Sequence, residues 1–504
     1  MKYLLGLDNG GTIVKAAIFD MKGRPVSVGK CQVKLILPRD FFVERSYSDV
    51  WQANVTAIHE AVKEAGIDPH DIAAVGVSGH ANGMYPRDVN GNWLGNGILS
   101  ADNRAKDFVT AWENDGTMAR NYSSTRQLLW AAQFPPLLAW MKKHDPGMYE
   151  SLDQAVCCKD FVRYCLTGEL CTDETDISSV NVMNVESGEY DKDVLVRMGL
   201  EDCIEKLPRT IVSSTAQCGR VHAAAAAETG LAEGTPVCAG VADITACAIA
   251  TGVMDEEKLC LVIGTWSINE FISKTLPENA SLFMANRYSL PGYYLLIEGS
   301  VTGASNLQWF LDTYMTEEAA LAKKMQKTVF DTCDEMLESV PFDDTGTMFT
   351  PFLFGSNVHI AARAGFIGLL GRHTKAHMLR AVYEGVTFSH RQHVEKLREA
   401  GCHNSAVRLS GGGAGSRPWV QMFADVLEAP MEVPEAKELG AMGVAMCAGV
   451  MLGEYADLRQ AAEAFTKIAY TVDPIPGRAP YYNARYEQYQ KLIKATDPLW
   501  DDWR

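Results

Sequence analysis

The sequence has no long hydrophobic run and is short of positive charge. Of its 504 residues, 46 are Lys or Arg and 63 are Asp or Glu, so the net charge is −17. This balance argues against nucleic acid or an anionic membrane as a partner. The first apolar run is broken at Asp8, too early for a signal peptide or a membrane span. We therefore expect a cytoplasmic protein, one that could form a homodimer.

Three further patterns are missing. The 13 cysteines have no metal-type spacing and fit a reducing compartment, with the adjacent Cys157 and Cys158 as small buried hydrophobes. No G-x-x-x-x-G-K-[ST] is present, which excludes a P-loop protein. The glycine run 411–416 has Ser416 where the Rossmann pattern needs its last glycine. The ordinary composition and the length predict roughly two to four globular units.

The opening stretch LLGLDNGGTIVKAAIFD predicts two paired strands joined by a turn. Its glycines could take positive φ and bring the backbone close to a ligand. The candidate phosphate ligands are the backbone N–H groups of Gly10 and Gly11, the Thr12 hydroxyl and the Lys15 ammonium. Asp8 could hold magnesium through its waters. An ordinary hairpin turn explains the same residues, and the stretch alone does not decide between the two.

An α/β layer with a mixed sheet is predicted next. A helix is expected over 49–65 and a buried strand over 72–79. The polar segment 80–104 leaves the carboxyl end of that strand, where open α/β sheets usually bind ligands. Its polar set comprises His80, Asn82, Asp102 and Arg104. These side chains suit polyol hydroxyls, although a structural ion pair between Asp102 and Arg104 is the alternative.

The second half repeats the opening pattern. Residues 258–271 again predict strand, Gly-Thr turn and strand, with Gly264 and Thr265 at the turn. Residues 407–416 predict a strand that enters a glycine turn, and an amphipathic helix follows. We place a domain boundary near residue 253, which gives domains 1–253 and 254–504. The two Gly-Thr hairpins could then hold a nucleotide's phosphates from opposite sides of a cleft.

Two candidate sites lie in this second set of segments. The glycine turn has a backbone that can approach a base or ribose, which favours nucleotide binding over a flexible loop. Asp243 is the single acid in the apolar stretch 238–252, where a carboxylate costs free energy unless it is paired or functional. It could be a general base or a helix N-cap. The residues alone weigh these two interpretations equally.

Together these stretches resemble the FGGY family of carbohydrate kinases. The similarity covers nearly the whole chain and rests on the order of seven segments: GLDNGGTIVKAAIFD, GVSGHANG, SADNR, KDFVRYCLTGE, GVADITACAIATG, VIGTWS and LSGGGAGSRPWVQMFAD. Within the family, ILSADNRA, TRQLLW, IGTWS and PFLFGSN look most like the L-xylulose kinases.

The resemblance implies an α/β fold of two actin-like, ribonuclease H-like domains around a central cleft. It implies ATP and Mg²⁺ as cofactors, with Asp243 as catalytic base and as a second candidate metal ligand beside Asp8. By position, the turn from Asp8 to Thr12 with Lys15 matches the first phosphate motif, Gly264 and Thr265 the second, and Gly412, Gly413 and Ser416 the adenosine motif. The candidate substrate residues are His80, Ala81, Asn82, Asp102 and Asp243.

Two motifs depart from the family pattern, at four positions. Lys15 stands where many members have arginine, and His80, Ala81 and Asn82 replace the glutamine, methionine and histidine of many xylulokinases. The expected function is ATP-dependent phosphorylation of a small sugar, a pentulose such as L-xylulose. Alternatives are a kinase for D-xylulose, gluconate, a tetritol or glycerol, and a non-catalytic, nucleotide-regulated binding protein of the same fold, which would not need Asp243 as a base.

Overall fold

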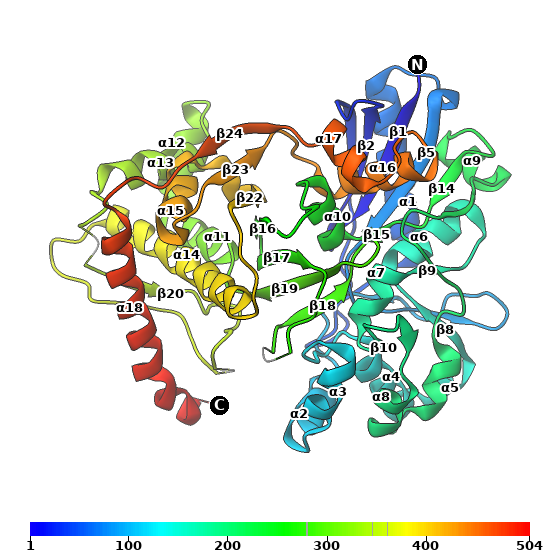
Figure 1. Ribbon diagram of the computed structural model, residues 1–504, viewed down its shortest axis with the longest axis horizontal. Coiled ribbons are helices and arrows are strands. Elements are labelled where there is room, and N and C mark those ends of the chain that lie inside the picture. Colours follow the sequence, from blue (N-terminus) through cyan, green and yellow to red (C-terminus); the bar gives the residue numbers. More distant parts are fainter. Residues whose placement is uncertain (279–280, 345, 360, 504) are drawn as a thin grey trace.

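The computed structural model describes residues 1–278, 281–344, 346–359 and 361–503. The chain forms two lobes, each built on a seven-stranded sheet (Figure 1). The strands of the first sheet, in spatial order, are β13 (Gln217–Arg220), β14 (Pro236–Cys238), β5 (Ile72–Gly79), β1 (Tyr3–Asn9), β2 (Ile13–Asp20) and β3 (Pro25–Gln32), and β15 (Val241–Ala242) also pairs with β5.

The second sheet has the same central arrangement. Its strands, in order, are β18 (Met284–Arg287), β19 (Tyr294–Ser300), β17 (Ser267–Ser273), β16 (Lys258–Ile263), β22 (Ala406–Ser410), β23 (Met431–Pro434) and β24 (Ile468–Val472). In both lobes an antiparallel trio, β3-β2-β1 or β19-β17-β16, is followed by a parallel fourth strand, β5 or β22. The predicted repeat of one α/β pattern in the two halves is confirmed.

The first predicted turn forms between β1 and β2, but not for the conformational reason expected. Neither Gly10 nor Gly11 has a positive φ, so the prediction of left-handed backbone here is wrong. A Cβ added at Gly11 would have no atom within 4 Å. The turn is open to solvent on this side, and that open space is what would admit a phosphate.

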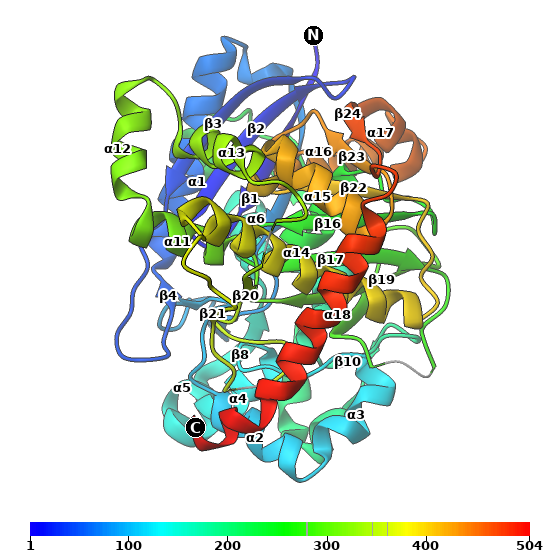
Figure 2. The same cartoon turned by 90° about the vertical axis from the view of Figure 1, so that its left-hand side faces the viewer.

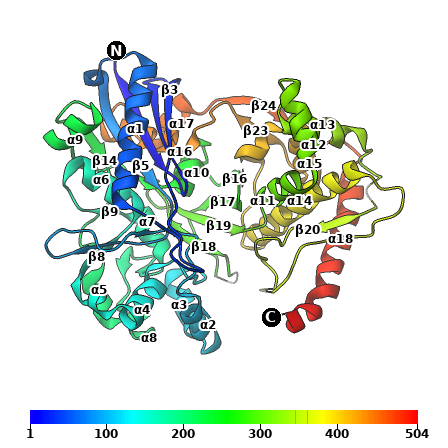
Figure 3. The same cartoon turned by 180° about the vertical axis from the view of Figure 1, so that it is seen from behind.

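Helix α1 (Tyr47–Ala65) forms where a helix was predicted. Ser46 caps it by accepting a hydrogen bond from the Asp49 N–H, and Gly66 ends it in the left-handed conformation. Figure 3 shows α1 across one face of the first sheet. The other helices of this lobe are α2 (Lys106–Asn114), α3 (Thr117–Thr125), α4 (Phe134–His144), α5 (Pro146–Ser151), α6 (Cys158–Thr167), α7 (Glu174–Ile177), α8 (Lys192–Arg197), α9 (Ala223–Thr229) and α10 (Asp243–Ala250).

The opposite face of the first sheet is covered by a helix from the second half of the chain, α16 (Leu439–Met451), with α17 (Leu458–Phe465) beside it (Figure 1). A Cβ at Gly6 would lie 1.9 Å from the Ala441 carbonyl oxygen, and one at Gly76 would lie 2.0 Å from that of Val444. Glycine is therefore required for this close approach. The domain boundary near residue 253 stays a proposal. With that boundary, α16 and α17 belong to the second domain by sequence but lie against the first sheet.

The second lobe packs its sheet against α14 (Lys375–Glu399) and α15 (Arg417–Leu427), and Figure 2 shows α18 (Ala479–Thr496) lying along its outer side. The predicted apolar face of α15 is buried. The remaining helices here are α11 (Ser305–Tyr314), α12 (Thr316–Lys324) and α13 (Val329–Ser339). Short strands complete the fold: β4 (Glu44–Arg45), β6 (Tyr85–Asp88), β7 (Gly97–Ile98), β8 (Leu152–Val156), β9 (Thr172–Asp173), β10 (Met183–Asn184), β11 (Glu189–Tyr190), β12 (Ile211–Val212), β20 (Met348–Thr350) and β21 (Gly365–Ile367).

The cysteines are mostly free thiols. Cys157 and Cys158 are fully buried, as predicted. Cys171 and Cys218 form a disulfide, and the other eleven cysteines are unpaired. This one pair departs from the all-thiol state that a reducing compartment favours.

Candidate active site

A polar cluster forms where β1, β5 and β15 end at the same edge of the first sheet. Asp8 lies near the end of β1, and its Oδ1 accepts a hydrogen bond of 2.9 Å from the Ser78 hydroxyl of β5. Because β15 pairs in parallel with the last residues of β5, Asp243 follows beside the turn that begins at His80. The Ala81 N–H donates to Asp243 Oδ1 at 3.3 Å. The structure thus brings together Asp8, Asp243 and the 80–82 turn.

Asp243 is the first residue of α10, and the N-cap position belongs to Ala242. The N-cap interpretation of Asp243 is therefore wrong. Burial, together with the negative charge of Asp8, raises the pKa of the Asp243 carboxyl to about 7, while hydrogen bonds from Ile244 and Ala81 oppose the shift. A carboxyl group with this pKa is suited to accept a proton near neutral pH. The pKa of Asp8 is also raised by burial.

His80 and Asn82 present unpaired polar atoms in this cluster. Both side chains are buried, and within the described residues neither His80 Nδ1 nor Asn82 Oδ1 has a hydrogen-bond partner. Burial lowers the pKa of His80 to about 3, with a contribution from the positive charge of Arg45, so the imidazole is neutral. Asn82 takes a positive φ of 61°, which asparagine tolerates better than most residues. Buried polar atoms of this kind normally have partners, and a role of these two residues in substrate binding stays a prediction.

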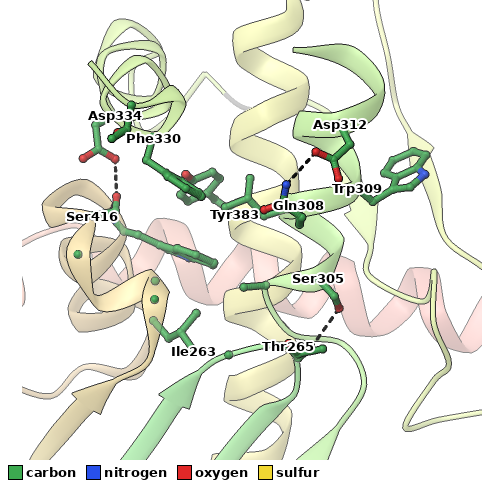
Figure 4. Close-up of a pocket in the computed structure, with 18 of the residues that line it drawn as sticks. Ile263, Thr265, Ser305, Gln308, Trp309, Asp312, Phe330, Asp334, Tyr383 and Ser416 are labelled. Carbon is green, nitrogen blue, oxygen red and sulfur yellow. Dashed lines mark hydrogen bonds between the residues drawn. The ribbon is translucent and has the colours of Figure 1, made fainter. Parts of the chain in front are cut away.

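A second site is a cavity of about 870 Å³ in the second lobe. It contains five of the predicted nucleotide-binding residues: Gly264, Thr265, Gly412, Gly413 and Ser416. Figure 4 shows Thr265 and Ser305 at one side of the cavity and Ser416 at the other, with α13 above Ser416. Gly411 has φ 85°, and a Cβ there would lie 2.4 Å from the Ile263 carbonyl oxygen. Glycine is needed at this turn for both reasons.

Comparison with known proteins identifies the chain's relatives. The model of the FGGY N-terminal domain matches residues 3–250 and that of the C-terminal domain matches residues 259–452. A probable L-xylulose kinase of Pasteurella multocida is 34% identical over 500 residues, covering 99% of this chain and all of that protein. The chain belongs to the FGGY family of carbohydrate kinases. Its activity is therefore the ATP-dependent phosphorylation of a sugar.

Other relatives of this FGGY kinase agree with the assignment. The L-xylulose/3-keto-L-gulonate kinase of Escherichia coli K12 is 34% identical over 495 residues, covering 98% of this chain and 97% of that one. A xylulose kinase structure from Lactobacillus acidophilus, 22% identical, superimposes with a TM-score of 0.90 over both full chains. That likeness shows the fold, and it confirms the predicted actin-like architecture.

Asp102 does not have a free carboxylate in this kinase. It is 1% exposed, and its two oxygens accept hydrogen bonds from Arg104 Nε at 2.9 Å and Nη2 at 2.8 Å. Arg104 also pairs with Glu44 at 2.6 Å. The ion pair considered from the sequence is thus present, and a direct contact of Asp102 with the sugar stays a prediction.

Arg45 is a site residue that the sequence did not reveal. Its side chain is fully buried, and its Nη1 donates to the carbonyl oxygens of Gly10 at 2.8 Å and Gly11 at 3.4 Å. The same guanidinium donates to the Tyr85 hydroxyl at 2.9 Å, and that hydroxyl contacts His80 Nε2 at 3.3 Å. Arg45 therefore links the first phosphate turn to the substrate turn.

Glu438 and Gly440, at the start of α16, were also missed. Glu438 pairs with Lys15 at 3.0 Å and with Lys30 at 2.5 Å. A Cβ at Gly440 would lie 2.6 Å from the Asp8 carboxylate, so Asp8 packs directly on the first turn of this helix. The positive end of the helix dipole favours a carboxylate at this position. Lys15 and Asp8 are thus both positioned by a helix that lies more than 400 residues away in sequence.

Proposed function

We propose that this kinase transfers the γ-phosphoryl group of ATP to an uncharged pentulose such as L-xylulose. The observation that supports this most strongly is the pair of unpartnered atoms, His80 Nδ1 and Asn82 Oδ1, beside the Asp243 carboxylate. A neutral imidazole and an amide bind hydroxyl groups without requiring charge on the ligand. The names of the Pasteurella and Escherichia relatives support the same substrate class.

In the proposed mechanism, Asp243 accepts the proton of one sugar hydroxyl. The oxygen then attacks the γ-phosphorus in line, a new O–P bond forms, and the bond to the bridging oxygen of ADP breaks. The backbone of the Gly264–Thr265 turn, together with the Gly10–Thr12 turn and Lys15, would hold the phosphate oxygens as charge develops. No group in the chain needs to be modified covalently.

Magnesium fits the cluster at the edge of the first sheet. The negative charge of Asp8 opposes ionisation of the Asp243 carboxyl and raises its pKa, and a divalent cation would relieve that repulsion. The described residues contain no set of three protein ligands for a metal, and magnesium in kinases usually takes one or two carboxylates plus substrate phosphates. We propose Asp8 as its ligand through water, with Asp243 as a second candidate. When bound, the cation would neutralise phosphate charge.

Closure of the two lobes would exclude water from the reaction. Contacts between the lobes include the Ala285 N–H of β18, which donates to the Arg126 carbonyl oxygen at 2.9 Å, and Arg287 of the same strand, which pairs with Glu174 at 3.0 Å. We propose that the lobes rotate about these contacts. The cytoplasm, as the compartment that holds ATP, and a homodimeric state also stay proposals.

One assay of substrates tests the proposed substrate. L-xylulose, D-xylulose, 3-keto-L-gulonate, gluconate and glycerol would each be offered with MgATP, and ADP release would be measured by coupling. We expect the highest kcat/KM with a pentulose. The Escherichia relative also has a carboxylated sugar in its name, but Arg104, Arg45 and Lys15 in this chain already have partners. A higher kcat/KM with either sugar acid than with both pentuloses would overturn the proposal.

A further inference from the structure

Helix α13 forms one wall of the nucleotide cavity and faces the first turn of α15 (Figure 4). Phe330 and Asp334 are four residues apart on α13 and therefore project from the same side of the helix. Both line the cavity. Phe330 is 49% exposed, so its apolar surface is accessible to a ligand. Figure 4 shows this ring pointing into the cavity.

Bare backbone also lines this space. Gly412 lines the cavity, and a Cβ added there would have no atom within 4 Å. The Phe330 ring and this backbone border one cavity, a slot that a flat, apolar ligand can enter. A purine base has this shape, and it can stack on the Phe330 ring.

Asp334 sits at the edge of this slot in a fixed orientation. The Ser416 hydroxyl donates to Asp334 Oδ1, and its oxygen accepts the Trp419 N–H at 3.3 Å as the N-cap of α15. The serine hydroxyl has therefore used its one proton on Asp334. Within the described residues no hydrogen bond is formed by Asp334 Oδ2. This oxygen is available to accept a hydrogen bond from a ligand in the cavity.

We propose that Asp334 binds the exocyclic amino group of adenine while the base stacks on Phe330, so that Asp334 sets the preference for ATP over 6-oxopurine nucleotides. Adenine has a donor at its 6-position, whereas hypoxanthine and guanine have a carbonyl oxygen there. An ionised carboxylate only accepts hydrogen bonds, so it attracts the 6-amino group of adenine and repels the 6-carbonyl oxygen of hypoxanthine or guanine. The inference rests on the proposed function for its kinetic consequences, but nucleotide binding tests it without any sugar.

Calorimetric binding of ADP, IDP and 2′-deoxy-ADP to the full chain tests the assignment. The wild-type protein should bind ADP and 2′-deoxy-ADP at least tenfold more tightly than IDP. Asp334→Asn has an amide that can donate to the 6-oxo group. It should therefore lower the affinity for ADP and raise the affinity for IDP, changing the ratio of the two dissociation constants by about tenfold or more. Asp334→Ala should lower the affinity for ADP without raising the affinity for IDP. This result separates recognition of the 6-amino group from a general change in the pocket.

Glu335→Gln is the matched control, because Glu335 is exposed on the same helix and pairs with Lys327 outside the cavity. Its ADP-to-IDP ratio should equal that of the wild type. Equal weakening of ADP and IDP in both Asp334 variants would overturn the proposal, as would a wild-type protein without preference between them. Selective loss of affinity for 2′-deoxy-ADP in the wild type would also overturn it, and assign Asp334 to the ribose. A chain with the expected nucleotide pattern that phosphorylates no sugar would refute only the proposed function.

Discussion

Replacing Asp243 with asparagine tests the centre of the mechanism. The substitution keeps the size of the side chain but removes the proton acceptor beside the substrate turn. A positioned general base contributes about 10²–10⁴ in rate, equivalent to roughly 3–5 kcal/mol of activation free energy. We therefore expect kcat to fall by at least a hundredfold. Binding of ADP should be nearly unchanged, because the lining of the nucleotide cavity comes from the second lobe.

The pH profile gives this prediction a second, independent readout. The pKa of Asp243 is raised to about 7, so the wild-type kcat/KM should rise as pH increases through 7 and the carboxyl loses its proton. Since the charge of Asp8 helps to raise that pKa, Asp8→Asn should move the rise to lower pH. Asp193→Asn changes an exposed acid at the start of α8 and should leave the profile in place.

Steady-state rates from a coupled assay provide the measurement, at pH values from 5.5 to 9, with saturating ATP and with sugar varied from below to above its KM, so that both kcat and kcat/KM are obtained. A loss of kcat below tenfold in Asp243→Asn would refute the assignment of Asp243 as the base. A profile that is flat through pH 7 in the wild type, or that keeps its position in Asp8→Asn, would refute the electrostatic part of the reasoning.

Three other outcomes are expected. Asn82→Ala should lower kcat/KM for the best sugar by about tenfold to a hundredfold with KM for ATP unchanged, because a substrate hydroxyl loses its partner; an unaltered kcat/KM would contradict this. Burial raises the pKa of Glu270 to about 8, so the folded state keeps a proton that the unfolded state has lost above about pH 4.5. The free energy of unfolding of the wild type should therefore fall from pH 4.5 to 8, by up to about 5 kcal/mol at roughly 1.4 kcal/mol per pKa unit. If the melting temperature of Glu270→Gln fell with pH as steeply as that of the wild type, this expectation would be wrong. Solution scattering should show a smaller radius of gyration with sugar and a non-hydrolysable ATP analogue, and an unchanged radius would count against closure.

Local patterns in the sequence predicted the elements that position the site. Apolar patterning predicted β1, β2 and β16, and helical spacing predicted α1 close to its observed limits and the presence of α15. These elements are encoded within about twenty residues, so periodicity and turn residues suffice to find them. The glycine turn at 411–416 was found for the same reason, since strand, turn and helix are contiguous in the chain; its binding of adenosine stays a prediction.

Contacts between distant segments could not be predicted in this way. Arg45 is adjacent in sequence to an ordinary surface helix, yet its guanidinium is buried between the first phosphate turn and Tyr85. Nothing in the composition around residue 45 distinguishes a buried arginine from an exposed one. The raised pKa of Asp243 likewise depends on Asp8, which lies 235 positions earlier in the printed sequence. The sequence could suggest a role for each residue but not their proximity.

The path of α16 shows how both halves of the chain contribute residues to the predicted phosphate site around Asp8 and Lys15. The adenosine turn at 411–416 leads through α15 and β23 to Glu438, where α16 begins. That helix then crosses to the first sheet, where the glycines at 6 and 76 allow it to approach the strands closely. Its first turn contacts Asp8 through Gly440 and Lys15 through Glu438. A short covalent segment thus connects the nucleoside-binding turn to the carboxylate and the lysine of the first phosphate turn. Because α16 packs on the first sheet, its contacts with Asp8 and Lys15 belong to the first lobe, and the chain passes from one lobe to the other before Glu438.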